Sequence, residues 1–307
     1  MSVPTRIRPK RPSDITHFIR IPLLNQTSSF QIQETLWKVH NDPLSATIPH
    51  QGYQPLQGLR IGVAALSLPT QESRNHATSL LGDLGNQDWR KLFSKAQATR
   101  PNIRTSSAAN TELLSSDVHC GPRPLVVDLV GLGDSVLRHR PSNLENALRL
   151  YLFIKETTSL LQSFCTSLAQ KFLDAGLERR GSLEPNRDGH AFLQIRAIDT
   201  TGLSSEIPNI KSMQTYGRPY RVPRFDAREL CGKYKDIVWA KGVHLDRVCI
   251  SERGPEDIFE DEQCVGKRYR DIASVPLPGI TWEPRSFEYM RIPHRWATAE
   301  SQGRVYA

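Results

Sequence analysis

Two segments of the chain alternate apolar and polar residues in the way expected of half-buried strands. In residues 59–68, the apolar face consists of Leu59, Ile61, Val63 and Ala65, and the opposite face of Arg60, Gly62 and Ala64. In residues 190–198, the apolar face consists of Ala191, Leu193, Ile195 and Ala197, and the opposite face of His190, Phe192, Gln194 and Arg196. The two opposite faces are candidates either for a shared binding surface or for ordinary contact with solvent.

Further strands and helices are predicted around these two segments. Strand patterns occupy residues 16–23, 124–133 and 147–154, and helical patterns begin near residues 28, 69 and 157. The strongest helical pattern is 157–177, where apolar residues recur at three- and four-residue steps until Gly176. A short helix opened by Asp226 comes later, and residues 242–252 and 267–277 are expected to form a final antiparallel pair of strands.

The order of these elements predicts an α+β fold. Strand–helix–strand units recur in both halves of the chain, which indicates two similar lobes with mainly antiparallel sheets. We divide the chain into a basic tail (1–15), a first lobe (16–94), a linker or insertion (95–122), a second lobe with the closing strands (123–277) and a C-terminal extension (278–307). Gly131-Leu132-Gly133 lacks the third glycine of a dinucleotide-binding loop, which argues against a doubly wound fold.

Composition narrows the class of protein without indicating its chemistry. The 307 residues include 40 Lys and Arg and 32 Asp and Glu, and the net charge of +8 suits either an anionic partner or a plain solvated surface. No apolar run reaches the roughly 20 residues of a membrane span, and the basic N-terminus lacks the apolar region of a secretory signal. The five cysteines form no C-x-x-C pair, and no residue cluster has metal-ligand spacing. We therefore expect an intracellular protein, cytoplasmic or nuclear, without metal, cofactor or membrane partner.

Five segments, taken together, resemble one protein family. They are THFIRIPL (16–23), LRIGVAALSL (59–68), HAFLQIRAI (190–198), RFDARELCGKYKDIVWAKGVHLDRVCISERG (224–254) and KRYRDIASVPLP (267–278). In this order they resemble the two-histidine (2H) phosphoesterase superfamily, and within it the A-kinase-anchoring-protein-like, 2′-5′ RNA ligase-like branch of fungal type. The resemblance implies two lobes flanking a central cleft, each lobe contributing a strand with a His-x-Thr or His-x-Ser motif. In that family the histidines move protons on a phosphodiester, such as a 2′,3′-cyclic phosphate or 2′,5′-linked RNA, and the hydroxyls hold phosphate oxygens.

The sequence departs from this family at three of the four signature side chains. LRIG at 59–62 stands where the family has L-H-x-T, and HAF at 190–192 keeps His190 but has Phe192 in place of the hydroxyl. Arginine stays protonated at pH 7, with a pKa above about 12, so Arg60 can bind a phosphate with two N–H groups but cannot shuttle a proton. Loss of one general acid or base typically costs about 3–5 kcal/mol of transition-state stabilisation. Phe192 is able to stack on a base.

Three functions are compatible with these residues. The first is a degenerate family member that binds a nucleotide or RNA phosphate in the cleft with little or no turnover. Its catalytic remnant would be His190, and its ligand-binding residues would be Arg60, Gly62, Phe192, Gln194 and Arg196. The second is a diverged phosphodiesterase that acts through His190 while Arg60 stabilises charge. The third is a protein-interaction scaffold whose partner binds the extension from Pro278 onward, which is rich in Trp, Tyr and Arg.

Overall fold

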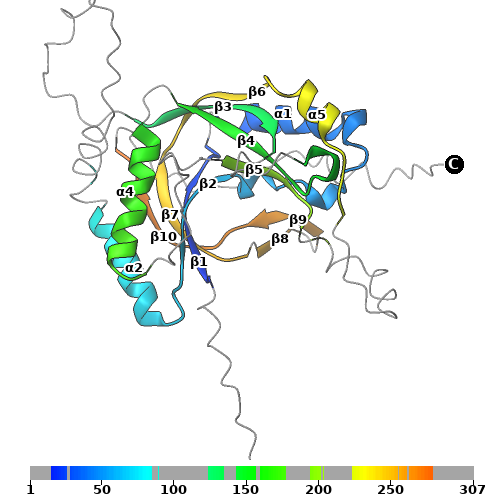
Figure 1. Cartoon of the computed structure of the whole chain (residues 1–307). Helices are drawn as coiled ribbons and strands as arrows, with labels where there is room; N and C mark the ends of the chain where they lie inside the picture. The colour runs from blue at the N-terminus through cyan, green and yellow to red at the C-terminus, as the bar shows by residue number, and fades with distance from the viewer. Residues whose placement is uncertain are drawn as a thin grey trace, which may run out of the picture.

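Two four-stranded antiparallel sheets form the framework of the protein (Figure 1). The computed structural model describes residues 15–25, 28–84, 89, 124–134, 143–156, 160–177, 194–201, 203, 223–254, 256–260 and 263–278. The first sheet has the order β10-β7-β1-β2, formed by β10 (Asp271–Pro276), β7 (Arg247–Glu252), β1 (His17–Pro22) and β2 (Arg60–Leu66). The second has the order β5-β4-β3-β6, formed by β5 (Gln194–Asp199), β4 (Arg149–Glu156), β3 (Val126–Gly133) and β6 (Val238–His244). A separate hairpin consists of β8 (Glu256–Glu260) and β9 (Gln263–Arg268).

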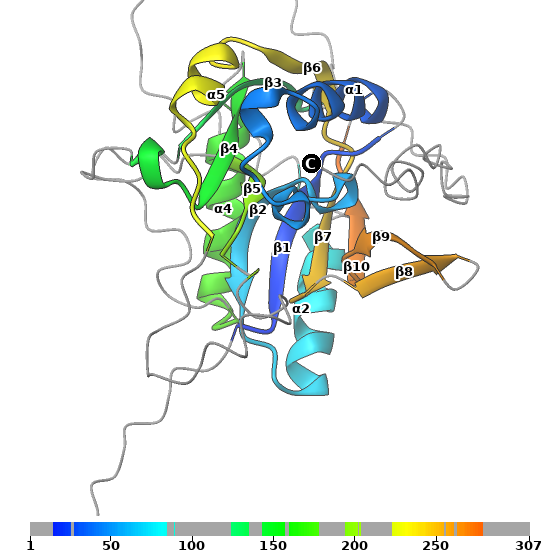
Figure 2. The same cartoon turned by 90° about the vertical axis from the view of Figure 1, so that its right-hand side faces the viewer.

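The helices connect the two sheets by packing across them. Helix α1 (Ser29–His40) follows a strand of the first sheet but packs against β6 of the second, whereas α4 (Leu160–Asp174) follows a strand of the second sheet and packs against β2 of the first (Figures 1 and 2). Helix α2 (Gln71–Asp83) lies along β10, and the short α5 (Arg228–Lys233) lies against β3. Short 3-10 helices fill the connections: η1 (Pro43–Ser45), η2 (His50–Gly52), η3 (Leu56–Gly58) and η5 (Leu144–Asn146).

Helix α4 confirms the strongest helical pattern in the sequence. Its apolar stripe is fully buried: Leu161, Phe164, Cys165, Leu168 and Phe172 are each at most 1% exposed. The described part of the helix begins at Leu160, where the Glu156 carboxylate accepts hydrogen bonds from the backbone N–H groups of Leu160 and Leu161. Gly176 follows the helix with φ +71, a left-handed conformation that glycine adopts without strain.

The alternation predicted for residues 59–68 sets the orientation of β2. Ile61 and Val63 are fully buried in the core, whereas Arg60 is half-buried and Gly62 is exposed on the opposite face. On the neighbouring strand, Arg20 pairs with Gly62, and the register then shifts after Ile19. The face of β2 that carries Arg60 is therefore continuous with the face of β1 that carries Arg20.

Strands β2 and β5, the edge strands of their sheets, lie side by side (Figures 1 and 2). The segment before β2 holds them together, because the Gln54 N–H donates to the Ala197 carbonyl (2.9 Å) and Tyr53 forms a β-bridge with Ile198. After β2, the Ser67 N–H donates to the Leu177 carbonyl beyond α4 (3.2 Å). The two strands singled out by their alternating patterns thus meet where the two sheets meet.

The structure confirms an α+β fold with two antiparallel sheets and corrects two of the expected strands. Residues 267–277 are not a single strand, because β9 ends at Arg268 and β10 begins at Asp271 in another sheet. Residues 242–252 are not a single strand: the chain leaves β6 at His244, passes Leu245 and Asp246, and enters β7 in the other sheet. β7 and β10 do form the expected antiparallel pair. The division into lobes at 16–94 and 123–277 stays a prediction. The insertion at 95–122 and residues 279–307 lie outside the described residues, and no helix within the described ranges is long and apolar enough to cross a bilayer.

A buried carboxylate joins the connection after α1 to helix α5. Asp42 accepts hydrogen bonds from Lys233 Nζ, Tyr234 Oη and the Leu44 N–H. Burial alone would raise the pKa of Asp42, but these hydrogen bonds outweigh it and lower the pKa to about 2. The folded-state pKa lies below the ordinary value of 3.8, so this contribution to stability is complete above about pH 3.8 and is lost as the pH falls through about 2.

We expect Asp42→Asn to lower the free energy of unfolding at pH 7 by about 1.5–3 kcal/mol, the usual contribution of hydrogen bonds to a charged group. Urea unfolding of the wild type and the variant between pH 7 and pH 2 measures the effect, and the difference should shrink below pH 3.8. Asp226→Asn is the matched control, since Asp226 is exposed and bonds its neighbour Arg228. Equal losses in both variants, or a difference independent of pH, would contradict the expectation.

Candidate anion-binding site

Arg60 projects from the first residue of β2 and lies against two aromatic rings. Its Cζ is 3.7 Å from the centroid of the Tyr269 ring and 5.3 Å from that of Phe18 on β1. Both distances fall within the range of a cation–π contact. Its Nη1 is buried and has no hydrogen-bond partner in the described part of the chain. The rings therefore hold the guanidinium in place, while its Nη1 makes no hydrogen bond to the described residues.

Arg20, on the neighbouring strand β1, is bound to the protein on two sides. Its Nε donates to Ser251 Oγ (2.5 Å), its Nη2 donates to Asp271 Oδ1 (2.7 Å), and Ser251 Oγ also donates to Asp271 Oδ1 (2.6 Å). Only 7% of the Arg20 side chain is exposed. Asp271 compensates the charge of Arg20, so Arg20 has a structural role beside the site. Among the described residues, no carboxylate forms an ion pair with Arg60.

The charge of Arg60 is held in an unfavourable environment. Burial lowers the pKa of Arg60, and the positive charges of Arg20 and Arg196 lower it further, although the Tyr269 hydroxyl counteracts them. A buried cation with cationic neighbours is stabilised by an anion that enters its site. Gly62 leaves room beside it, since a Cβ at this position would have no atom within 4 Å.

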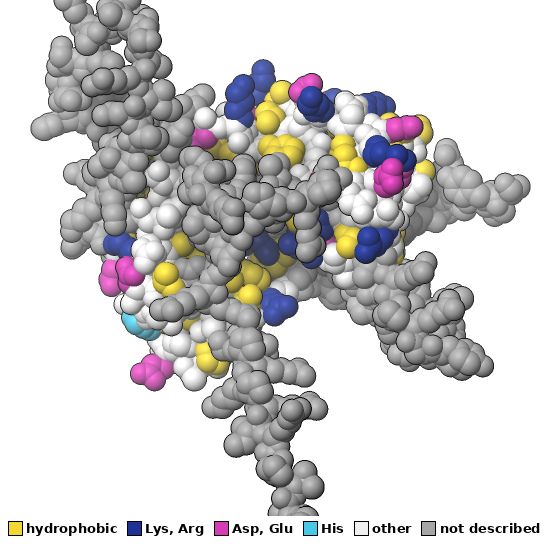
Figure 3. All heavy atoms as spheres, viewed as in Figure 1, with side chains coloured by type: hydrophobic (Ala, Val, Ile, Leu, Met, Phe, Trp, Pro, Cys, Tyr) yellow, Lys and Arg dark blue, Asp and Glu magenta, His cyan; other side chains and the backbone are white. Residues whose placement is uncertain are grey.

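Arg196 comes from the second sheet and completes the positive surface. It is exposed on β5, and its Nη1 donates to Asp199 Oδ2 (2.7 Å). Figure 3 shows dark-blue Lys and Arg side chains gathered in the middle of the face that it presents. We call Arg20, Arg60 and Arg196 the arginine cluster; it draws on β1, β2 and β5 and so includes residues of both sheets.

The structure brings together only part of the predicted site. Arg60, Gly62 and Arg196 lie on the two adjacent strands as the alternation predicts. His190 and Phe192 lie outside the described residues, and Gln194 is described as the first residue of β5 without its side chain. Their predicted roles stay predictions.

The sequence analysis missed the partners of Arg60, namely Phe18, Arg20 and Tyr269. Phe18 and Arg20 share one face of β1 by the same two-residue period, so alternation was a usable signal for them. Tyr269 has no comparable local signal, because it lies between β9 and β10 and reaches Arg60 from the far end of the chain.

The remaining candidate features are metal-ligating groups and the literal His-x-Thr string of the sequence. Within the described residues, no group of three His, Cys, Asp or Glu side chains is arranged to hold a metal ion. The literal His-x-Thr at residues 76–78 lies inside α2, where His76 and Thr78 are exposed on a helix and not on a strand of either sheet.

Comparison with known proteins gives matches only at the level of structure. No family model matches the sequence, and no curated protein matches it either. Among solved structures, a Thermus thermophilus protein, TT0787, is similar with a TM-score of 0.41 and 12% identity, covering 85% of this chain and 97% of that one. A phosphoesterase has a TM-score of 0.39 and 11% identity, covering 85% and 97%.

The similar structures also include LigT of E. coli. In its complex with 3′-AMP, LigT has a TM-score of 0.39 and 12% identity, covering 86% of this chain and 98% of its own. LigT has been solved with NADP+ and with ATP as well.

Proposed function

We propose that the protein binds the phosphate of a nucleotide or of RNA at Arg60, with little or no turnover. The observation that carries the proposal is the buried Nη1 of Arg60, which has no hydrogen-bond partner in the described part of the chain. A buried N–H group of a charged side chain that makes no hydrogen bond costs free energy. A phosphate oxygen that accepts a hydrogen bond from this group removes that cost. The resemblance to 2H phosphoesterases in the sequence supports phosphate as the anion.

The chemistry of Arg60 separates binding from catalysis. A guanidinium donates hydrogen bonds to phosphate oxygens and stabilises their charge, but it stays protonated and takes no proton from a nucleophile. Burial lowers the pKa of Arg60 and the neighbouring Tyr269 raises it again, and an arginine guanidinium stays protonated in proteins at neutral pH. A site with Arg60 in place of the first histidine therefore favours retention of a ligand over its cleavage.

Calorimetric titration with 3′-AMP, with adenosine as the phosphate-free control, tests the proposal. We expect 3′-AMP to bind, adenosine to bind at least about tenfold more weakly, and the affinity for 3′-AMP to fall as salt rises from 50 to 200 mM, as expected for a contact to phosphate. Equal affinity for 3′-AMP and adenosine, or no binding of either, would contradict phosphate recognition.

The diverged phosphodiesterase is the second candidate, and the observation that favours it is His190 in the sequence. Turnover of 2′,3′-cyclic AMP and 2′,5′-linked oligoadenylate by the wild type, measured beside His190→Ala, separates the two functions. The proposal expects no turnover from either protein. Turnover by the wild type that His190→Ala abolishes would replace it with an enzymatic function.

A further inference from the structure

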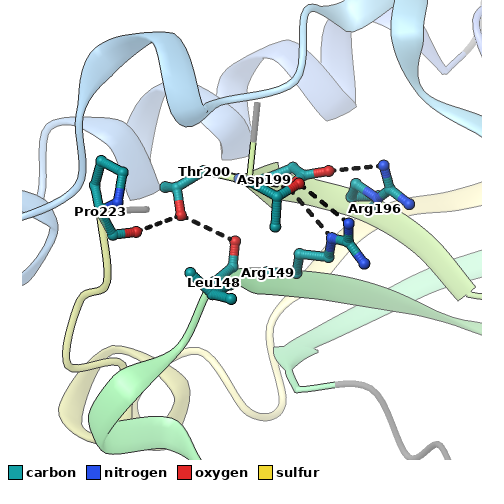
Figure 4. Close-up of polar contacts among 7 residues, drawn as sticks. Leu148, Arg149, Arg196, Asp199, Thr200 and Pro223 are labelled. Atoms are coloured by element: carbon teal, nitrogen blue, oxygen red, sulfur yellow. Dashed lines mark hydrogen bonds and ion pairs between the residues drawn. The ribbon is translucent and has the colours of Figure 1, made fainter. Parts of the chain in front are cut away.

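A pair of arginines bridged by one carboxylate lies where β4 and β5 are joined (Figure 4). Asp199 accepts from Arg149 Nε at Oδ1 (3.2 Å) and from Arg196 Nη1 at Oδ2 (2.7 Å). Its Oδ1 also accepts from the backbone N–H (2.9 Å) and the hydroxyl (2.6 Å) of Thr201. Figure 4 shows the two guanidiniums on the same side of β5, while Thr200 points the other way to the carbonyls of Leu148 and Pro223.

The pair is fixed in position and still accessible. Asp199 is only 10% exposed, but the side chains of Arg149 and Arg196 are 41% and 47% exposed. A guanidinium has five N–H groups. In the described residues, Arg149 uses one on Asp199 and one on Thr201, and Arg196 uses one on Asp199. Both side chains therefore keep donors for a ligand while Asp199 removes much of the entropy cost of ordering them.

The pair carries net positive charge close to Arg60. Two guanidiniums and one carboxylate leave a charge of +1, and interactions with Thr201, Arg196 and Arg149 lower the pKa of Asp199 against the effect of its burial, so it stays ionised at neutral pH. Arg196 lies near enough to Arg60 for its charge to lower the pKa of Arg60. Strands β2 and β5, which carry Arg60 and Arg196, contact each other, so an anion bound at Arg60 and an anion bound at the pair would lie on adjacent strands.

We propose that Arg149 and Arg196 form a second phosphate subsite, so that the ligand is an oligonucleotide with two phosphates and not a mononucleotide. The inference rests on the proposed function, since it takes the first phosphate to lie at Arg60. Planar guanidiniums match the oxygens of a phosphate, and a cation held by a buried carboxylate presents its donors in one orientation. Asp199 is then a positioning residue for both arginines.

The test compares a ligand with one phosphate and a ligand with two. We use 3′-AMP and the dinucleotide ApAp, which carries an internal phosphodiester and a terminal 3′-phosphate, and titrate the wild type, Arg149→Gln and Lys38→Ala. Lys38 is a matched control because it is an exposed cation, paired with Glu34 on α1. Arg149→Gln removes a surface cation and opens no core, since the side chain is 41% exposed.

We expect the wild type to bind ApAp about tenfold tighter than 3′-AMP, the step of one charged hydrogen-bonded contact. Arg149→Gln should lose most of the tighter binding of ApAp and keep its affinity for 3′-AMP within about twofold. The slope of log affinity for ApAp against log salt concentration should become shallower by about 0.7, the value for one contact to a single-strand phosphate. Lys38→Ala should change none of these. Wild-type protein that binds both ligands equally, or Arg149→Gln that matches Lys38→Ala, overturns the second subsite while binding at Arg60 stands. Wild-type protein that binds neither ligand overturns the proposed function itself.

Discussion

Arg60→Ala is expected to weaken the binding of 3′-AMP by roughly 10- to 150-fold. Removing a charged hydrogen-bond donor typically costs about 1.5–3 kcal/mol, and about 1.4 kcal/mol corresponds to a factor of ten in the dissociation constant. The effect should be large because Arg60 Nη1 has no competing partner in the described protein and because no carboxylate forms an ion pair with it there. Calorimetric titration of the variant beside the wild type measures the loss.

A second substitution distinguishes charge from geometry at the same position. Arg60→Lys keeps the positive charge but loses the planar fork and its stacking on Tyr269, so we expect an affinity between those of the wild type and Arg60→Ala. Thermal unfolding of both variants verifies that they are folded, and Lys38→Ala again serves as the control for a lost surface cation. An Arg60→Ala protein that is folded and binds 3′-AMP as the wild type does would rule out the proposed site.

Gly131→Ala is expected to destabilise the protein by about 2–5 kcal/mol. Gly131 has φ +63, where a residue with a Cβ is strained by about 1–2 kcal/mol, and its Cβ would lie 2.7 Å from the Lys235 carbonyl oxygen. Relieving such a contact adds about 1–3 kcal/mol. The backbone cannot simply move away, because the Gly131 N–H donates to Ile237 O (2.7 Å) and its carbonyl accepts from the buried Trp239 indole (2.8 Å). Urea unfolding measures the change.

Gly82→Ala is the matched control for this prediction. Gly82 lies in the last turn of α2, and a Cβ there would meet no atom within 4 Å. Alanine is preferred over glycine by about 0.5–1 kcal/mol in a helix interior and by less near a helix end, so this variant should be as stable as the wild type or slightly more stable. If Gly131→Ala instead unfolds at the same urea concentration as the wild type, the close approach to Lys235 does not restrict this position. The result also bears on the Gly131-Leu132-Gly133 motif, which the structure uses for backbone packing.

Local periodicity predicted the orientation of the site strands but not the contacts between them. The two-residue period at 59–63 placed Arg60 and Gly62 opposite the core because burial of Ile61 and Val63 leaves no other orientation for this part of β2. The period does not continue to residue 65, because the register irregularity puts Ala64 and not Ala65 in the main hydrophobic cluster. The pattern at 194–198 placed Arg196 in the same way. By contrast, the ion pair of Arg20 and Asp271 joins residues 251 positions apart, and no pattern in either segment indicates the other.

The error at residues 242–252 has a different cause. The apolar alternation changes phase within this segment, from Val243 and Leu245 to Val248 and Ile250, and the prediction of a single strand did not use this signal. The break at Leu245 and Asp246 follows from tertiary structure: the Leu245 N–H donates to Leu125 O beside β3, and the Asp246 carbonyl accepts from Leu277 beyond β10. These hydrogen bonds fix Leu245 beside one sheet and Asp246 beside the other, so the strand ends between them. Leu125 and Leu277 are both far from this segment in the sequence.

The pairing of β1 with β7 joins strands from the first and the last part of the described chain in one sheet. β1 and β2 come from the first part of the chain and β7 and β10 from the last, so the middle of the first sheet is a seam between distant segments. Ile19 and Ile250, both fully buried, meet across that seam. A protein cut between α2 and β3 would consist of two fragments, each with a bare apolar strand edge that only the other fragment covers. Such fragments have reason to reassemble when produced together and to aggregate when produced apart, which makes this connection a natural place for a split-protein reporter of association.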